Sequence, residues 1–276
     1  MNAARKKPTR GPVQAQTASA TYVYCVARAK SLRLPARAPR LPEAGKPRAI
    51  ELGGDLWLVV CDVPLEHYDQ KPLERGLRDL DWVSRCALAH QGVMAELSRS
   101  STVAPMKLFT LFASEQRARD HLRRIRPRVE KLLDRVAGHQ EWGVRLRFDA
   151  KKMRDRLDAR SRKRGGPQTG RGFLALKHAQ KHASERLVVD AVADGERLFS
   201  ELGREVADAR RRPLAQKEAS SGVLLDAAFL VRATAVRDFK RRVTSAAERL
   251  RERGIAVALT GPWPAYSFLK EPARAR

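Results

Sequence analysis

The sequence predicts an α+β protein of two domains, in which long helices pack on antiparallel or mixed sheets. Short β-branched and aromatic segments alternate with segments whose apolar residues recur at helical spacing. The 276 residues are 43% hydrophobic, which suffices for the cores of one large or two ordinary domains. A predicted helix ends near Gly138 and a new strand follows it, so we place the domain boundary between residues 138 and 139.

The first domain is expected over residues 21–138, after a disordered basic tail over residues 1–20. Its opening strand is apolar on both alternating faces, which is typical of a central strand. The run Gly53-Gly54-Asp55 separates two apolar runs and predicts a hairpin. The expected elements are a strand over 21–27, hairpin strands near 49–52 and 56–63, a helix over 81–98 capped by Asp79 or Asp81, an extended segment over 102–114 and a helix over 114–136 kinked at Pro127.

The second domain is expected over residues 139–276, with a basic Gly-rich loop near residues 160–172. Its first strand alternates apolar and polar side chains, so one face of that strand should be buried. The expected elements are a strand over 140–149, a helical region over 173–214 of one helix or two meeting near Gly195, a strand over 222–233, a helix from 234 or 235 to 253 and a strand over 255–261. This order predicts a ferredoxin-like domain.

The charge of the chain is strongly positive, with 56 basic and 31 acidic residues and a net charge of +25. Such a charge indicates a nucleic-acid or acidic partner as one class of function. The arginines are spread along helices, and no helix-turn-helix, zinc-finger or RNA-binding motif occurs, so a nucleic-acid-binding protein is the alternative function. No apolar run reaches the roughly 18 residues of a membrane span, and no secretory signal follows the basic start.

Two histidine arrangements are candidate sites with simpler interpretations. His178 and His182 stand four apart on one helix face, as zinc ligands do, but flanking lysines would repel a dication. A solvated basic face is therefore favoured. His90 lies on the apolar stripe of its predicted helix without a nucleophile beside it, which favours a buried structural histidine.

No arrangement of residues predicts catalysis. The Gly-rich run at residues 162–172 lacks both the preceding strand and the terminal Lys-Ser/Thr of a phosphate loop. The carboxylate pairs Asp79 with Asp81 and Glu141 with Asp149 are expected in surface or capping roles. We expect no catalytic residue, cofactor or metal, although an enzyme built on the second domain is a third class of function. The three cysteines form no Cys-x-x-Cys pair and are expected to be buried thiols.

The segment at residues 102–114 is apolar on both faces and broken by Pro105, which excludes an interior ladder position there. A buried edge strand is the simpler interpretation. The alternative is an exposed edge that pairs with a β-strand of a partner. The candidate partner-binding residues of this segment are Met106, Leu108, Phe109, Leu111 and Phe112.

Six stretches are specific in combination. They are TYVYCVA (21–27), DVPLEHY (62–68), DLDWVSRCALAHQGVM (79–94), TVAPMKLFTLF (102–112), EWGVRL (141–146) and LTGPWPAYSF (259–268). Their order and spacing resemble the gas vesicle proteins of the GvpL/GvpF family over residues 21–268. The basic tail and the Arg-rich loop around residues 160–171 fall outside this resemblance.

The resemblance implies two α+β domains, the second ferredoxin-like, and a non-enzymatic accessory role in gas vesicle assembly. The implied partner is the small, hydrophobic major shell protein, with other gas vesicle accessory proteins as further partners and the cytoplasm or the vesicle as the location. The protein would act as an assembly factor or as a minor vesicle component. A free shell protein of strong β and apolar character would aggregate, so we expect the partner to be shielded.

The closing stretch concentrates rigid and aromatic residues near the terminus. Pro262 and Pro264 favour an extended path, along which Trp263, Tyr266 and Phe268 can be held against the body of the protein. We expect this stretch to dock between the two domains and fix their orientation. The residues of this structural signature are His90, Trp142, Pro262, Trp263, Pro264 and Tyr266.

Overall fold

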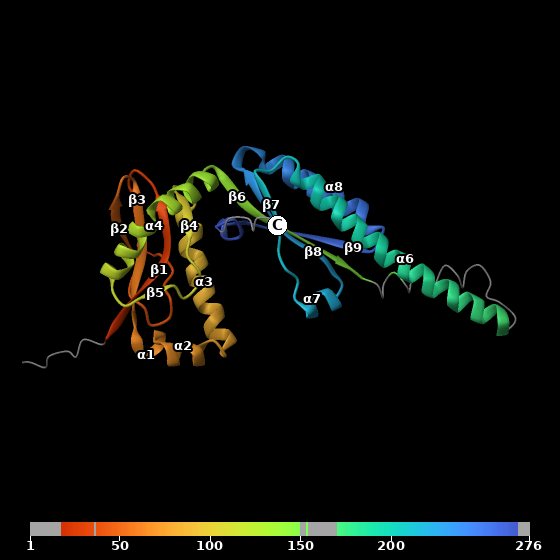
Figure 1. The fold of residues 1–276 in the computed structure, drawn as a ribbon, viewed down its shortest axis with the longest axis horizontal. Coiled ribbons are helices and arrows are strands. Elements are labelled where there is room, and N and C mark those ends of the chain that lie inside the picture. The colour runs from red at the N-terminus through yellow and green to blue at the C-terminus, as the bar shows by residue number, and fades with distance from the viewer. Residues whose placement is uncertain (1–17, 36, 150–152, 154–169, 270–276) are drawn as a thin grey trace, which may run out of the picture.

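The computed structural model describes residues 18–35, 37–149, 153 and 170–269, whose strands form two antiparallel sheets. Helix α4 (Glu115–Val136) packs on the N-terminal sheet and leads into β6 (His139–Phe148) of the C-terminal sheet (Figure 1). The predicted α+β class is confirmed. Residues 1–17 of the expected tail and residues 160–169 of the expected loop lie outside the described part of the chain.

The N-terminal sheet has its first strand at the centre, as the apolar run of that strand predicts. Its strands are β1 (Ser19–Arg28), β2 (Arg48–Gly53), β3 (Leu56–Pro64), β4 (Thr102–Pro105) and β5 (Leu111–Phe112). The order is β2-β3-β1-β4. The short strand β5 also pairs with β1, at residues 21 and 22, whereas β4 pairs with β1 at residues 25–28. The predicted hairpin forms, with Gly53 and Gly54 at the positive φ that its turn requires. The segment expected at 102–114 forms two short strands with a loop between them.

Helices cover both faces of the N-terminal sheet. One face packs against α3 (Leu80–Leu97) through Tyr24, Cys61 and Met94, and the other packs against α4 through Val23, Leu58 and Leu133. Two helices that the sequence analysis did not expect, α1 (Leu65–Tyr68) and α2 (Gln70–Gly76), connect β3 to α3. β1 is therefore buried on both sides, which explains why its sequence shows no polar alternation.

Polar side chains cap both long helices of this region. The carboxylate of Asp79 accepts hydrogen bonds from two backbone N–H groups in the first turn of α3. The hydroxyl of Ser114 accepts one from the backbone N–H of Arg117 at the start of α4. Gly138, with φ of +69°, follows α4 and allows the chain to turn into β6. Pro127 lies inside α4.

The C-terminal sheet has the connectivity of a ferredoxin-like fold, as predicted. Its strands are β6, β7 (Asp208–Arg211), β8 (Val223–Arg232) and β9 (Ile255–Trp263), and its helices are α6 (Gly170–Gly203), α7 (Gln216–Ser220) and α8 (Val236–Arg251). The strand order is β7-β8-β6-β9 with every neighbour antiparallel. α6 and α8 pack on one face through a core that includes Trp142, Leu146, Phe229 and Phe239.

The prediction of helix over residues 173–214 is wrong for the last part of this range. α6 continues through Gly195 as one helix, but β7 replaces the expected helix at residues 208–211. Pairing with β8 overrides local helix preference here, because Ala209 packs on the core while Asp208 and Arg210 meet partners on the open face. The last strand also runs two residues further than expected, to Trp263.

Candidate functional site between the two sheets

Four aromatic side chains from distant stretches of the chain meet where α3 approaches the closing stretch. We call this set the aromatic junction: Tyr22 and Tyr24 of β1, His90 of α3 and Tyr266. The rings of Tyr24 and His90 are stacked with centroids 5.6 Å apart, and the ring of Tyr266 lies 6.3 Å from His90. The junction thus links the N-terminal sheet to the end of the chain.

His90 is the most constrained member of the aromatic junction. Its side chain is 3% exposed, and its Nδ1 lies 2.6 Å from the hydroxyl of Tyr22. Its Nε2 is buried and has no hydrogen-bond partner among the described residues. Burial disfavours the imidazolium and lowers the pKa of His90 to about 4, so the ring is neutral at physiological pH.

A buried carboxylate holds the closing stretch from the other side. Glu141 of β6 is 2% exposed, and its oxygens accept hydrogen bonds from the backbone N–H and hydroxyl of Ser267 at 2.8 and 2.7 Å. Arg212 donates to the same carboxylate at 2.8 Å. The expected surface or capping role of Glu141 is wrong: alternation places its side chain on the open face of β6, and the closing turn then covers it.

Ion pairs extend from Glu141 across the open face of the C-terminal sheet. Arg212 also bonds Asp226 of β8 at 3.1 Å, and Arg145 of β6 pairs with Asp226 as well. Arg210 donates to the backbone carbonyl of Ser267 at 2.9 Å. We call the set Glu141, Arg145, Arg212, Asp226 and Ser267 the ionic network. Together with Arg210 of β7, it attaches the closing turn to three strands of the sheet.

The closing stretch is only partly buried. Phe268 is fully buried in a small core with Val136, Ala228, Leu230 and Ala265, which come from α4, β8 and the closing stretch itself. Trp263 differs from the expectation of a packed aromatic, because it is 40% exposed and its Nε1 donates to the Thr260 hydroxyl at 3.1 Å. Trp142 lies instead in the core beneath α8, with the ammonium of Lys240 over its ring.

A cleft of about 600 Å³ lies between the two sheets beside Trp263. It is bordered by the C-terminal half of α3, by β4, by the start of β6 and by the closing stretch. Its lining includes Gln91, Ala95, Ser98, Val103, His139, Gln140, Pro262, Trp263, Pro264 and Ala265. Three of the residues expected as a structural signature, Pro262, Trp263 and Pro264, therefore line this cleft, while His90 and Tyr266 lie in the aromatic junction.

One stripe on the side of α3 that faces away from the sheet is uncharged, and the exposed Asp81 and Arg85 lie beside it. We call this stripe the outer face of α3: Leu80, Ser84, Ala87, Leu88, Gln91, Ala95 and Ser98. Leu80 is 78% exposed and Leu88 is 73% exposed, while Gln91, Ala95 and Ser98 continue into the cleft. The buried stripe of this helix was predicted from the sequence, and the opposite stripe was not. The signal was there, since uncharged residues recur at helical spacing in a chain of which 32% is charged.

The expected partner-binding residues of the 102–114 segment are half-buried. Met106 and Phe112 pack against the core beneath α4, and Leu108, Phe109 and Leu111 pack against the core beneath α3. The ring of Phe109 stacks on Trp82 with centroids 5.4 Å apart. The segment wraps the edge of the sheet and uses its apolar side chains internally, so the simpler interpretation, a buried edge strand, describes it better.

The described residues include neither a metal-ligand cluster nor a membrane-spanning helix. No group of three His, Cys, Asp or Glu side chains in this part of the chain is arranged to hold a metal ion, and none of its helices is long and apolar enough to span a bilayer. The side chain of His178 lies outside the described set. The three cysteines are buried and unpaired, and burial raises the pKa of Cys61 and Cys86 to about 11, so these thiols are unreactive.

Comparison with known proteins gives a consistent result. A family model described as "Gas vesicle synthesis protein GvpL/GvpF" matches residues 20–270. Gas vesicle protein L of Streptomyces sp. (strain CB03234) is 32% identical over 253 residues, which covers 90% of this chain and 91% of the relative. Gas vesicle protein F of the same strain is 27% identical over 263 residues, covering 91% and 99%.

Solved structures agree at the level of the fold. The crystal structure of GvpF from Anabaena sp. PCC7120 has a TM-score of 0.62 and 13% identity, covering 94% of this chain and 99% of its own. GvpF from Microcystis aeruginosa has a TM-score of 0.57 and 12% identity, covering 91% and 99%. The family model and the relative at 32% identity together decide the assignment. This chain belongs to the gas vesicle synthesis protein GvpL/GvpF family.

Proposed function

We propose that this gas vesicle accessory protein binds the small, hydrophobic major shell protein through the outer face of α3 and the adjoining cleft. The observation that carries the proposal is the exposure of Leu80 and Leu88 on a stripe of uncharged residues in a highly charged chain. Large apolar side chains exposed on one surface of a folded protein are typical of an interaction site. A hydrophobic shell subunit is a partner of matching chemistry.

The cleft supplies a second part of the proposed surface. Trp263 is exposed there on a segment fixed by Phe268 and Ser267, so its indole can contact a partner without a large loss of side-chain freedom. Small residues of α3, such as Ala95 and Ser98, leave room for a close approach. We propose that a partner segment lies along α3 and ends against Trp263.

The proposed mechanism is shielding. A shell subunit with exposed apolar and strand-forming surface aggregates when free, and covering that surface until it joins the growing shell prevents this. The role requires only a binding surface, so we propose a non-enzymatic assembly factor that acts in the cytoplasm at the growing vesicle. We also propose that the chain divides into domains at residues 138–139, with the closing stretch fixing the two relative to each other.

The experiment is co-expression with the major shell protein of the same organism, followed by affinity capture of this chain at low and high salt. We expect the shell protein to be captured at both, because apolar contacts survive screening. The double variant Leu80→Asp/Leu88→Asp should reduce capture at least tenfold. Both leucines are exposed, so circular dichroism and melting temperature should not change.

The matched control is Ala256→Asp/Ala258→Asp, which places two carboxylates on the exposed face of β9. It should leave capture unchanged. Equal loss with both double variants, or undiminished capture with the Leu80 and Leu88 variant folded, would reject the outer face of α3 as the shell-binding surface.

A further inference from the structure

Helix α4 has two flanks of different electrostatic character on either side of the stripe that packs on the sheet. On the flank toward the β2–β3 hairpin, arginines are paired within the helix. Arg119 pairs with Glu115 at 2.8 Å, Arg123 with Asp120 at 3.2 Å and Arg126 with Glu130 at 2.8 Å. All of these are pairs of the i,i+3 or i,i+4 type.

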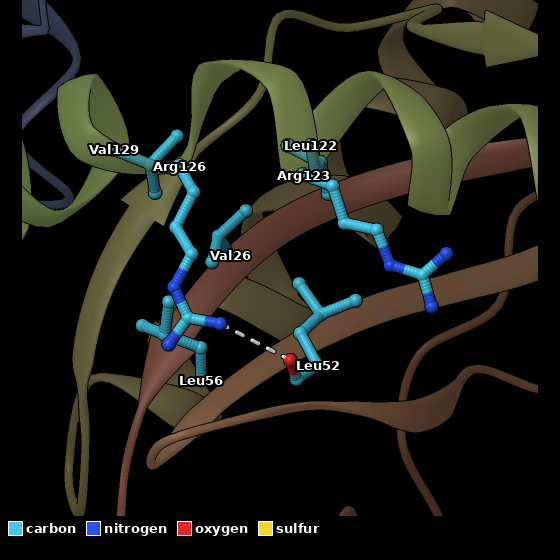
Figure 2. A pocket seen from close by; sticks show the side chains of 7 residues that line it. All are labelled: Val26, Leu52, Leu56, Leu122, Arg123, Arg126 and Val129. Atoms are coloured by element: carbon cyan, nitrogen blue, oxygen red, sulfur yellow. Dashed lines mark hydrogen bonds between the residues drawn. The ribbon is translucent and has the colours of Figure 1, made fainter.

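Arg126 on this paired flank also serves the fold. Its guanidinium donates to the backbone carbonyls of Leu52 and Gly53 in the hairpin, and Figure 2 shows the first of these bonds. The space enclosed beneath it, between α4 and the hairpin, is about 10 Å³, which holds at most one water molecule. The paired flank is therefore structural, and its charges are already satisfied.

The opposite flank carries charges that the described chain does not neutralise. Arg117, Arg124 and Arg128 are exposed, and none has a carboxylate within ion-pair distance among the residues that the structure describes. We call these three the basic flank. His121 lies between them, and its ring contacts Phe112 with centroids 5.3 Å apart. The basic flank therefore borders the edge formed by β4 and β5.

The spacing of the basic flank has a defined period. Together with His121, the arginines stand four, three and four residues apart, which is the heptad spacing at which two helices stay in register. At about 1.5 Å per residue, the row from Arg117 to Arg128 extends for roughly 16 Å along the helix. A partner helix with carboxylates at the same spacing would place one carboxylate opposite each guanidinium.

We propose that the basic flank of α4 docks an acidic amphipathic helix of a partner protein. Charge complementarity selects the partner, since three cations in a straight row stand without internal anions. A single-stranded nucleic acid fits less well, because binding sites of that kind add exposed aromatic rings for base stacking. On this flank the nearest aromatic ring, that of Phe112, is half-buried and packed against the core.

This surface is distinct from the shell-binding surface proposed above and does not depend on it. The outer face of α3 consists of uncharged residues, and α3 packs on the side of the N-terminal sheet opposite to α4. Binding at α4 should fall steeply with salt, whereas binding at α3 should not. Failure of one proposal is therefore separable from failure of the other.

The test uses the full chain and a synthetic helical peptide of about three heptads with glutamates at the a and d positions, labelled for fluorescence anisotropy. A scrambled peptide of equal composition and a single-stranded oligonucleotide of equal charge are the comparisons. We expect the heptad peptide to bind at least tenfold more tightly than both at low salt. The triple variant Arg117→Gln/Arg124→Gln/Arg128→Gln should weaken its binding at least tenfold.

The matched control removes three charges elsewhere. Arg232→Gln/Arg237→Gln/Arg251→Gln replaces three exposed arginines for which no ion pair is seen among the described residues, so net charge falls by the same amount. This control should weaken binding less than twofold. Equal weakening by both triple variants, or equal affinity for the scrambled peptide or the oligonucleotide, would overturn the proposal in favour of unspecific attraction of polyanions.

Discussion

The two sheets of this protein are held in different ways. The N-terminal sheet is covered by helices on both faces, and its central strand is apolar throughout. The C-terminal sheet is covered by helices on one face, and its other face carries the ionic network and the closing turn. Both sheets rely on apolar burial where helices cover them, and the C-terminal sheet adds paired charges on its open face that fix one end of the chain.

The closing stretch joins the two halves of the molecule. Two groups of side chains contact the closing stretch. The aromatic junction contacts it from the N-terminal sheet, and the ionic network contacts it from the C-terminal sheet. Tyr266 contacts the aromatic junction, and Ser267, the next residue in the chain, binds Glu141 of the ionic network. We propose that this double attachment sets the angle between the two sheets and hence the width of the cleft.

The largest difference in the free energy of unfolding should be seen between one substitution in the N-terminal sheet and one in the C-terminal sheet. Leu58→Ala removes a fully buried side chain from the core beneath α4 and should lower the free energy of unfolding by about 4 kcal/mol. Ala258→Lys changes the exposed face of β9 and should alter it by less than about 0.5 kcal/mol. Urea unfolding followed by circular dichroism measures both. Similar effects would mean that the open face is covered in solution.

A smaller effect is expected from the ionic network. Glu141→Gln removes one of the two carboxylates that pair with Arg212 and leaves Asp226 as the other, so it should lower the free energy of unfolding by about 2 kcal/mol. Ser267→Ala, which removes only the hydroxyl bond, should cost about 1 kcal/mol. Urea unfolding of both variants provides the comparison. If Glu141→Gln costs no more than Ser267→Ala, the network is not what holds the closing turn.

A pH-dependent effect concerns the protonation of His90. Its folded pKa of about 4 lies below the ordinary value of 6.5, so the unfolded chain binds more protons between these values. The contribution of neutral His90 to the free energy of unfolding is therefore fully present above pH 6.5 and is lost as the pH falls toward 4. From pH 7 to pH 5 the loss attributable to this group should be about 2 kcal/mol.

The measurement is urea unfolding at both pH values for the wild type and for His90→Asn. The two proteins differ only at position 90, and the tyrosines around His90 stay neutral because burial raises their pKa values. We expect the variant to lose about 2 kcal/mol less than the wild type over this range. An equal loss in both would show that position 90 is open to solvent.

Much of the fold could be predicted from the sequence, because burial leaves a periodic signal. The two-faced burial of β1 and the alternation in β6 both follow from their residue patterns. β7 could not be predicted, since a short edge strand of Asp and Arg is defined by its neighbours and not by its own preference. The expected burial of Trp263 was wrong because proline-fixed segments can present an aromatic outward as readily as inward.

The candidate site was less accessible to prediction. The sequence drew attention to the apolar 102–114 segment, but its side chains fill gaps on both faces of the sheet. The outer face of α3 carries few apolar residues, so it stands out only once the helix is placed and its exposed side is compared with the arginine-rich surface elsewhere. Glu141 likewise acquires its role from a turn that lies 126 residues further along the chain.

The most direct test of the proposed shell-binding surface is site-specific photo-cross-linking during co-expression with the major shell protein. A photoreactive amino acid is placed singly at Leu88 on α3, at Arg124 on α4 and at Ala258 on β9, all exposed positions. We predict a covalent adduct with the shell protein from position 88 and none from positions 124 and 258. Adducts from position 258 or 124 without one from position 88 would contradict the account.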